Sequence, residues 1–268
     1  MTTATTTTTQ SLTVDGVGLV DVSFTERGTG RPFLILHGGA GPQSVSGFAD
    51  LLAETTHVRV ITPTHPGFGG TPRPKGLDSI RRLAELYVAL LDHLDLNDVT
   101  VIGNSIGGWI CAEMALLRGS PRISNIILVD AVGIEVPIHP VADFFSLTMD
   151  QVAELSYHDP DSFRIDVSKM PPAQQAAMAG NRAALAVYGG TPSMVDPALR
   201  QRLKGINVPA LVLWGESDRI VDPDYGRAYA DAIPTARFQL LSGTGHVPQI
   251  ETPDLLLSAI RDFAGITK

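Results

Sequence analysis

A serine framed by glycines marks the stretch VIGNSIGGWI, residues 101–110. A serine hydroxyl is a poor nucleophile near neutral pH and needs a neighbouring base to take its proton. An apolar run that ends in Gly-x-Ser-x-Gly predicts a sharp turn from a strand into a helix, which would lift the side chain of Ser105 out of a sheet. Gly103 and Gly107 would let the two backbones pass closely. We therefore predict that Ser105 is a nucleophile.

Two further polar residues follow apolar runs later in the chain, Asp218 after PALVLWGES and His246 after ARFQLLSGTG. A histidine can take the proton of a serine when its other ring nitrogen is held by an acceptor, because the acceptor fixes the tautomer. We therefore expect His246 to be the base and Asp218 to be the acid that holds it. Asp130 also follows an apolar run and is the rival for the role of the acid.

Acyl transfer by such a triad also needs two N–H groups that stabilise an oxyanion. The stretch ILHGGAGP places two glycines directly after an apolar run, and the helix expected after the serine points its first N–H groups toward developing negative charge. Gly39 and Ile106 are therefore the predicted donors, and His37 is expected to order this loop. The sequence has no HExxH pattern and no paired Cys/His spacing, so no metal site is predicted, and the chemistry needs no cofactor.

The elements that would position these residues alternate along the chain. Continuous apolar runs precede the candidate groups and indicate strands covered on both faces, as in a parallel sheet. Stretches with helical periodicity lie between them, for example residues 79–94. An earlier run, LVDVSFTERG, alternates and predicts an antiparallel strand. The predicted fold class is α/β, with a mostly parallel sheet whose carboxyl edge gathers the functional residues.

The rhythm of strands and helices is interrupted between residues 133 and 204. This stretch contains several prolines and no run typical of a strand, so we expect a helical cap inserted into the sheet domain. The α/β core would then comprise residues 13–132 and 205–268. Residues 1–12 are rich in threonine and would form a flexible N-terminal extension.

The composition of the expected cap bears on the substrate. The cap contains eight acidic and six basic residues, without the basic cluster that would bind a phosphorylated or CoA-linked acyl group. Its aromatic residues Phe144, Phe145 and Tyr188 are candidate substrate contacts, since binding pockets are lined mainly by apolar side chains. The sequence therefore favours a small, mostly apolar substrate.

The chain of 268 residues carries a net charge of −8, which argues against nucleic acid and an anionic membrane as partners. It contains no apolar run long enough to span a membrane. The single cysteine, Cys111, cannot form an internal disulfide, and we expect a cytoplasmic location. The expected partner is a small-molecule substrate, and the sequence leaves a homo-oligomer open.

Five motifs together resemble, in their order, those of the α/β-hydrolase fold superfamily: LHGG, PTHPGFGGTPRP, GNSIGG, LWGESDRIV and GTGHVPQIETP. The resemblance covers roughly residues 15–265. It implies an eight-stranded sheet flanked by helices, with a helical cap after the sixth strand, and it assigns the roles given above to the same triad and oxyanion residues. The serine separates the chain from epoxide hydrolases and haloalkane dehalogenases, which place an aspartate at the position of Ser105.

The motifs HGGAGP and GNSIGG also resemble those of carbon–carbon bond hydrolases that act on ring-cleavage products. That subgroup usually has an aromatic residue after the catalytic histidine, where this chain has Val247, a further candidate substrate contact. We therefore expect a serine hydrolase that cleaves a small, mostly apolar ester or lactone through an acyl-enzyme. The alternatives left open are a carbon–carbon bond hydrolase of a vinylogous diketone, a hydroxynitrile lyase, a cofactor-free haloperoxidase and a non-catalytic small-molecule receptor.

Overall fold

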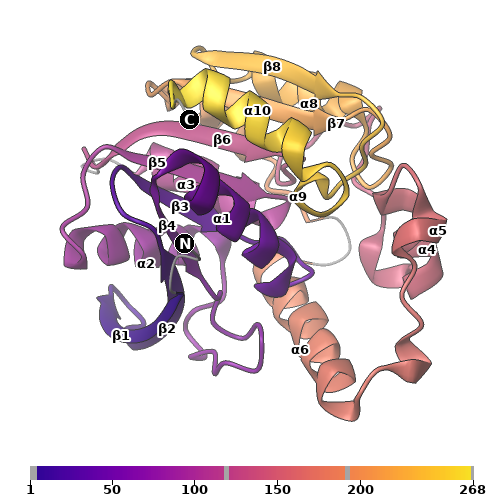
Figure 1. Ribbon diagram of the computed structural model, residues 1–268, viewed down its shortest axis with the longest axis horizontal. Coiled ribbons are helices and arrows are strands. Elements are labelled where there is room, and N and C mark those ends of the chain that lie inside the picture. Colours follow the sequence, from indigo (N-terminus) through magenta and orange to yellow (C-terminus); the bar gives the residue numbers. More distant parts are fainter. Residues whose placement is uncertain (1–4, 118–120, 191–193, 267–268) are drawn as a thin grey trace.

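The computed structural model describes residues 5–117, 121–190 and 194–266. Its centre is an eight-stranded sheet in the order β1-β2-β4-β3-β5-β6-β7-β8, shown in Figure 1. The pairs from β4 to β8 are parallel, whereas β2 is antiparallel to both β1 and β4. This confirms the predicted α/β class and the mostly parallel sheet. The strands are β1 Thr6–Val14, β2 Gly18–Arg27, β3 Pro32–Leu36, β4 Arg59–Pro63, β5 Val99–Asn104, β6 Ile123–Val129, β7 Ala210–Gly215 and β8 Ala236–Leu241.

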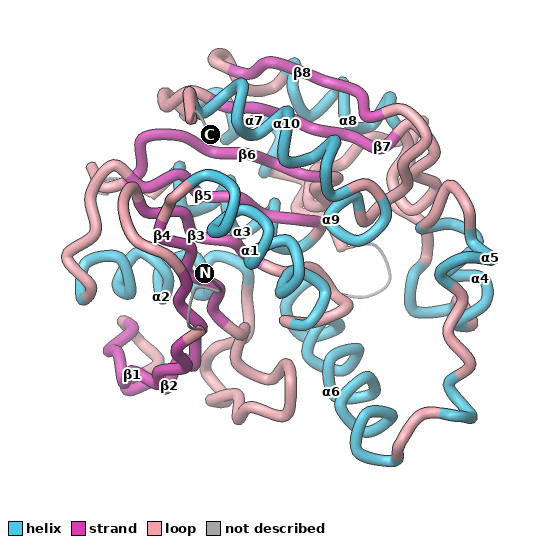
Figure 2. Tube along the Cα trace, in the orientation of Figure 1, coloured by secondary structure: helices cyan, strands magenta, loops and turns pink. Residues whose placement is uncertain are grey.

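Helices cover both faces of the sheet (Figure 2). Helices α1 and α10 pack on one face, where Phe33 and Ile35 of β3 are buried, and α2, α3 and α8 pack on the other face with Leu34 and Leu36. Because successive side chains of a strand point to opposite faces, burial on both sides explains the continuous apolar runs. The helices are α1 Gln43–Thr56, α2 Ile80–His93, α3 Ile106–Leu116, α8 Pro223–Asp231, α9 Pro248–Glu251 and α10 Pro253–Ala264.

The N-terminal segment differs from the expected flexible extension over residues 1–12. Strand β1 pairs with β2 along its whole length, with Thr6 opposite Glu26 and Val14 opposite Gly18. Leu12 and Val14 are buried in the core, and the threonines before them are exposed but well suited to a strand. The expectation of a flexible extension is therefore wrong for residues 6–12. The sequence does not reveal this strand, because its apolar residues lie only at its carboxyl end. Residues 1–4 lie outside the described part of the chain.

Between β6 and β7 the chain leaves the sheet and forms several helices, of which α4 (Met149–Ser156), α5 (Pro160–Phe163) and α6 (Pro172–Gly189) lie on the side of the carboxyl ends of the strands (Figure 1). Extended pairing in the described part of this segment is limited to one bridge, between Gly133 and Val195. No helix among the described residues is long and apolar enough to cross a membrane. The helices of this segment are η1 Phe144–Ser146, α4 Met149–Ser156, α5 Pro160–Phe163, η2 Val167–Lys169, α6 Pro172–Gly189, α7 Leu199–Arg202 and η3 Leu203–Gly205.

An ion pair joins the end of this segment to the sheet domain. The carboxylate of Glu113 on α3 is 5% exposed and accepts two hydrogen bonds from the guanidinium of Arg202 on α7, at 2.7 and 2.6 Å. Arg202 also pairs with Asp196, at 2.5 Å. A buried carboxylate that loses its cation is costly, because no water replaces the lost partner. The pair therefore fixes where the helical segment returns to the sheet.

We expect Arg202→Met to lower the free energy of unfolding by about 2 kcal/mol or more, since it leaves the buried carboxylate of Glu113 without a partner. The matched control is Arg200→Met, which removes an exposed guanidinium from the same helix. Urea denaturation of both variants and the wild type measures the difference. Equal stability of the two variants would contradict this account of the ion pair.

Candidate active site

The turn at Ser105 links β5 to α3. Its backbone angles are φ 56° and ψ −120°, a region that residues with a side chain rarely adopt. A Cβ atom on Gly103 would lie 2.1 Å from the carbonyl oxygen of Gly107, and one on Gly107 would lie 2.3 Å from that of Leu36. The strand and the helix thus pass so closely that both positions require glycine, as the sequence analysis predicts.

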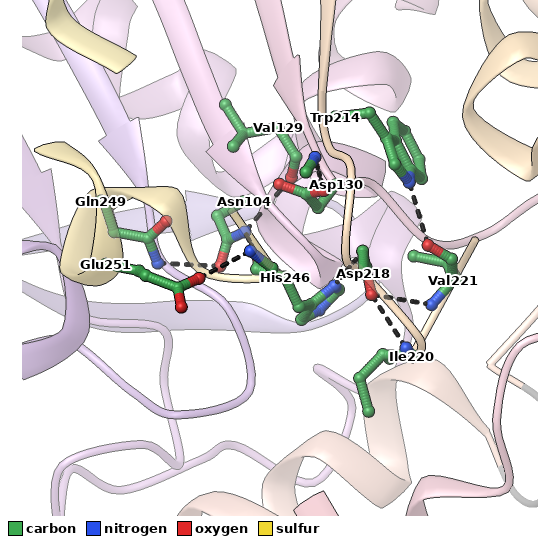
Figure 3. A network of polar contacts seen from close by, with 12 residues as sticks. Asn104, Val129, Asp130, Trp214, Asp218, Ile220, Val221, His246, Gln249 and Glu251 are labelled. Atoms are coloured by element: carbon green, nitrogen blue, oxygen red, sulfur yellow. Dashed lines mark hydrogen bonds and ion pairs between the residues drawn. The ribbon is translucent and has the colours of Figure 1, made fainter. Parts of the chain in front are cut away.

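The loops after β7 and β8 bring Asp218 and His246 together. The Nδ1 atom of His246 lies 2.8 Å from Oδ2 of Asp218 (Figure 3). The Oδ1 atom of Asp218 accepts the N–H groups of Ile220 at 2.8 Å and Val221 at 3.1 Å, and the residue is 1% exposed. Because the carboxylate only accepts, Nδ1 carries the proton and Nε2 is left as the basic atom.

Asn104 ties the loop of His246 to the strand that ends at the serine. Its side-chain amide donates to the carbonyl oxygen of His246 at 2.9 Å and accepts from Nε2 of Gln249 at 3.1 Å (Figure 3). Within the described residues the hydroxyl of Ser105 forms no hydrogen bond to His246 or to any other group. The contact between nucleophile and base often tightens only when substrate binds. Neither Asn104 nor Gln249 is among the residues predicted for the site from the sequence.

The helical segment also contacts the loop of His246. The backbone N–H of His246 donates to the carbonyl oxygen of Ser156, at the end of α4, at 2.7 Å. The carboxylate of Glu251 on α9 accepts the N–H of Gly245 at 2.6 Å and that of His158 at 2.8 Å. One carboxylate therefore joins the loop of His246 to the chain that follows α4.

The two predicted oxyanion donors flank the serine turn. Within the described part of the chain, the N–H groups of Gly39 and Ile106 donate to no protein acceptor. Ile106 begins α3, so its N–H has no partner within the helix. A Cβ atom on Gly38 would lie 3.2 Å from Cβ of Ser105, which shows how closely the glycine loop approaches the serine. Both N–H groups are thus available, and their role in stabilising an oxyanion stays a prediction.

Helix α6 lies over the glycine loop. The side-chain amide of Asn181 donates to the carbonyl oxygen of Ala40 at 3.1 Å and accepts the N–H of Gly69 at 2.8 Å. A Cβ atom on Gly39 would lie 2.7 Å from Cδ2 of Leu185, so this leucine packs directly against the α-carbon of Gly39. Asn181 is absent from the predicted site, because nothing in its local sequence indicates two partners more than 100 residues away.

A buried network of two histidines and a tyrosine holds the same loop. Nδ1 of His37 lies 2.8 Å from the carbonyl oxygen of Gly38, and its Nε2 accepts the N–H of His65 at 3.1 Å. Nε2 of His65 lies 2.9 Å from the carbonyl oxygen of His37, and its Nδ1 lies 2.5 Å from the hydroxyl of Tyr87. Each ring therefore donates to one of the two carbonyls that precede Gly39, which gives His37 the ordering role expected for it.

Burial keeps both of these rings neutral. Loss of hydration lowers the pKa of His37 to about 4, against the ordinary value of 6.5, and the hydrogen bond to Gly38 opposes this shift. Burial and the neighbouring His37 also lower the pKa of His65 well below the ordinary value. His65 is not among the residues predicted for the site, although it follows β4 at the same edge of the sheet.

The predicted substrate contacts have structural partners. The guanidinium of Arg182 lies 5.2 Å from the ring centre of Phe144 and 5.9 Å from that of Phe145, and both rings are half-buried. Tyr188 is buried, and its hydroxyl donates to the carbonyl oxygen of Pro66 at 2.8 Å. Val247 follows the histidine and is also buried. A contact of these four residues with substrate stays a prediction.

Comparison with known proteins identifies the family of the chain. Residues 31–253 match the family model of the alpha/beta hydrolase fold. The chain belongs to the α/β-hydrolase fold family. It is 26% identical to the 2-hydroxy-6-oxo-2,4-heptadienoate hydrolase of Pseudomonas putida, over 92% of this chain and 93% of that protein. The resemblance that the motifs indicate is thereby confirmed, and this α/β-hydrolase is an enzyme.

Two solved structures show the same fold. A thermophilic esterase from Thermogutta terrifontis superposes with a TM-score of 0.76 at 23% identity and covers 95% of this chain and 97% of its own. A bromoperoxidase from Bacillus anthracis also reaches 0.76, at 21% identity, and covers 96% and 100%. At these identities the likeness shows the fold of this α/β-hydrolase and does not identify its substrate.

We expect Gly107→Ala to destabilise the α/β-hydrolase by about 3 kcal/mol or more, because the added methyl group would meet the backbone oxygens of Leu36 and His37. The matched control is Gly47→Ala in α1, where a Cβ atom meets nothing within 4 Å and alanine should stabilise the helix by about 0.5–1 kcal/mol. Chemical denaturation measures both. Tolerance of alanine at position 107 would contradict the close approach.

Stability should also depend on pH through His37. Its pKa is lower in the folded chain, so the unfolded chain takes up the proton more readily and acid favours unfolding. The contribution of His37 to the free energy of unfolding is fully present above pH 6.5 and is lost as the pH falls toward about 4. This contribution is about 3 kcal/mol.

Urea denaturation between pH 7 and pH 4 tests this dependence. We expect a smaller loss of stability toward low pH in His37→Gln than in the wild type, whereas His93→Gln, which removes an exposed imidazole, should keep the wild-type slope. Parallel pH curves for the wild type and His37→Gln would be inconsistent with a neutral buried His37.

Proposed function

We propose that this α/β-hydrolase cleaves a small, mostly apolar ester or lactone through an acyl-enzyme on Ser105. The observation that carries the proposal is the 2.8 Å contact between Nδ1 of His246 and Oδ2 of Asp218, because it leaves Nε2 as a base. The strained turn at Ser105 and the link from Asn104 to the loop of His246 support the assignment of the nucleophile.

The reaction follows from these roles. His246 takes the proton of Ser105 while Oγ attacks the carbonyl carbon of the substrate, and the N–H groups of Gly39 and Ile106 stabilise the oxyanion. His246 then gives its proton to the leaving group, and the acyl group stays on the serine. Water, activated by the same histidine, attacks the acyl-enzyme and releases the acid. Every proton moves through His246, so no metal or redox group takes part in the proposed cycle.

Three of the four arginines of the helical segment support an uncharged substrate, and the fourth, Arg200, is exposed. Arg164 pairs with Asp150 and Glu154, and Arg202 pairs with Glu113. Arg182 donates to the carbonyl oxygens of residues 144, 145 and 147. These guanidinium groups are therefore already engaged, and recognition of a carboxylate or phosphate would have to break contacts that hold the segment in place.

Carbon–carbon bond cleavage is the second candidate, favoured by the similarity to the Pseudomonas putida hydrolase over 92% of the chain. The name of that relative describes a dienoate, which carries a carboxylate. A substrate of this kind must first be ketonised, and the same triad would serve that step. A screen of the purified enzyme against simple esters, lactones and a vinylogous 1,5-diketone separates the two candidates. The absence of turnover on all three classes would instead support a receptor.

Ser105→Ala should abolish nearly all turnover, because it removes the nucleophile. It should leave the fold intact, because it removes only one hydroxyl group from a half-buried residue. A fluorophosphonate probe should label the wild-type enzyme at Ser105, as peptide mass spectrometry would show, and should not label the variant. Labelling of a different serine would overturn the assignment of the nucleophile.

The length of the acyl chain should control the rate. Each further buried methylene contributes up to about 0.8 kcal/mol, or roughly fourfold in kcat/KM, until the pocket is full. We therefore expect kcat/KM for p-nitrophenyl esters to rise from acetate to butyrate or hexanoate. An optimum at acetate, or a strong preference for acyl-CoA over simple esters, would be incompatible with a small apolar acyl site.

A further inference from the structure

Asp130 is a buried acid that the proposed reaction does not use. It follows β6, its backbone N–H donates to the carbonyl oxygen of Leu213 at 3.0 Å, and its Oδ1 accepts the N–H of Gly215 at 2.8 Å. Its side chain is fully buried, and no N–H or hydroxyl group among the described residues donates a hydrogen bond to its Oδ2 atom. An unpaired buried carboxylate oxygen is costly, so this atom requires an explanation.

The acid of the proposed triad lies directly beside it (Figure 3). A carboxyl oxygen of Asp130, one of Asp218 and a ring nitrogen of His246 all lie within 4.8 Å of one another. Two carboxylates so close together in a buried site cannot both hold a charge, and one of them keeps a proton. The third acid that acts on this site is Glu251 of α9, whose charge has the same effect.

The hydrogen bonds decide which carboxyl group is neutral. Asp218 receives three N–H donors, from Ile220, Val221 and His246, and these stabilise its negative charge. Asp130 receives a single donor, from Gly215. The proton therefore belongs on the Oδ2 atom of Asp130, where it would also satisfy the unpaired oxygen. Burial and the charge of Asp218 accordingly raise the pKa of Asp130 well above its ordinary value.

We propose that Asp130 is a positioning residue of the triad: its neutral carboxyl group donates the Oδ2 proton to the carboxylate of Asp218 and holds that carboxylate against His246. This inference rests on the proposed function, because it gives Asp218 the role of the triad acid. The negative charge of Asp218 then interacts with two donors, the carboxyl group of Asp130 and the imidazole of His246. Without the proton of Asp130, the charge would stabilise the imidazolium that forms during catalysis more strongly.

Two substitutions of similar size distinguish the loss of the hydrogen-bond donor at position 130 from a change in side-chain packing. Asp130→Asn can keep a donor toward Asp218 through its amide, whereas Asp130→Leu cannot. We expect the acidic limb of the profile of kcat/KM against pH, which reports the protonation of the base, to shift upward by about half a unit or more in the leucine variant and to stay in place in the asparagine variant. The asparagine variant should also retain more activity than the leucine variant. Identical profiles in the two variants would overturn the proposal.

Infrared spectroscopy tests the proton directly and needs neither activity nor the leucine variant to fold. At neutral pH the difference spectrum of wild type minus Asp130→Asn should contain the C=O band of one protonated carboxyl group. The same band should appear when Asp130→Asn is subtracted in the Ser105→Ala background. Its absence at pH 7 would show that Asp130 is ionised and would overturn the proposal. If this band is present but the enzyme has no esterase activity, the proton on Asp130 is supported and only the proposed function is rejected.

The order of two asparagine substitutions completes the test. Asp218→Asn should lower kcat by about 10⁴, as in other triads that lose the orienting acid, and Asp130→Asn should cost far less. The reverse order would make Asp130 the triad acid and would contradict its role as a neutral donor.

Discussion

The close crossing of β5 and α3 at Ser105 is the constraint on which the site depends. The backbone oxygens of Leu36 and Gly107 occupy the space that side chains at the neighbouring glycines would need. One crossing therefore fixes three things together: the strained serine, the free N–H at the start of α3, and the glycine loop after β3. The interlocked backbones hold the serine at a positive φ that it would not adopt alone.

Around this crossing the protein buries many ionisable groups and keeps most of them uncharged. His37 and His65 are neutral because burial lowers their pKa values, and Asp130 is neutral because burial and a neighbouring acid raise its own. The charge of the site is concentrated on Asp218, where three N–H groups stabilise it. A single charge with fixed donors costs little reorganisation when an imidazolium forms beside it.

The sequence predicts strands β2 to β8, the glycine turn and the chain order of the proposed triad, because each of these has a local signal. Strand β1 escaped prediction because Leu12 and Val14 are its only buried residues. His65, Asn181 and Gln249 escaped because their roles depend on partners far away in the chain. Asp130 was recognised as an acid at a strand end, but its distance from Asp218 depends on how the two loops fold. The substrate remains a proposal, because side-chain packing between the helices and the sheet determines the pocket.

The most direct test of the account is detection of the acyl-enzyme. The enzyme is mixed with p-nitrophenyl butyrate, quenched in acid within the first turnover, digested and examined by mass spectrometry. The account predicts a butyryl group on the peptide that contains Ser105, formed at least as fast as the steady-state turnover and missing in Ser105→Ala. Turnover without this adduct, or a butyryl group on another residue that forms at the rate of turnover, would contradict it.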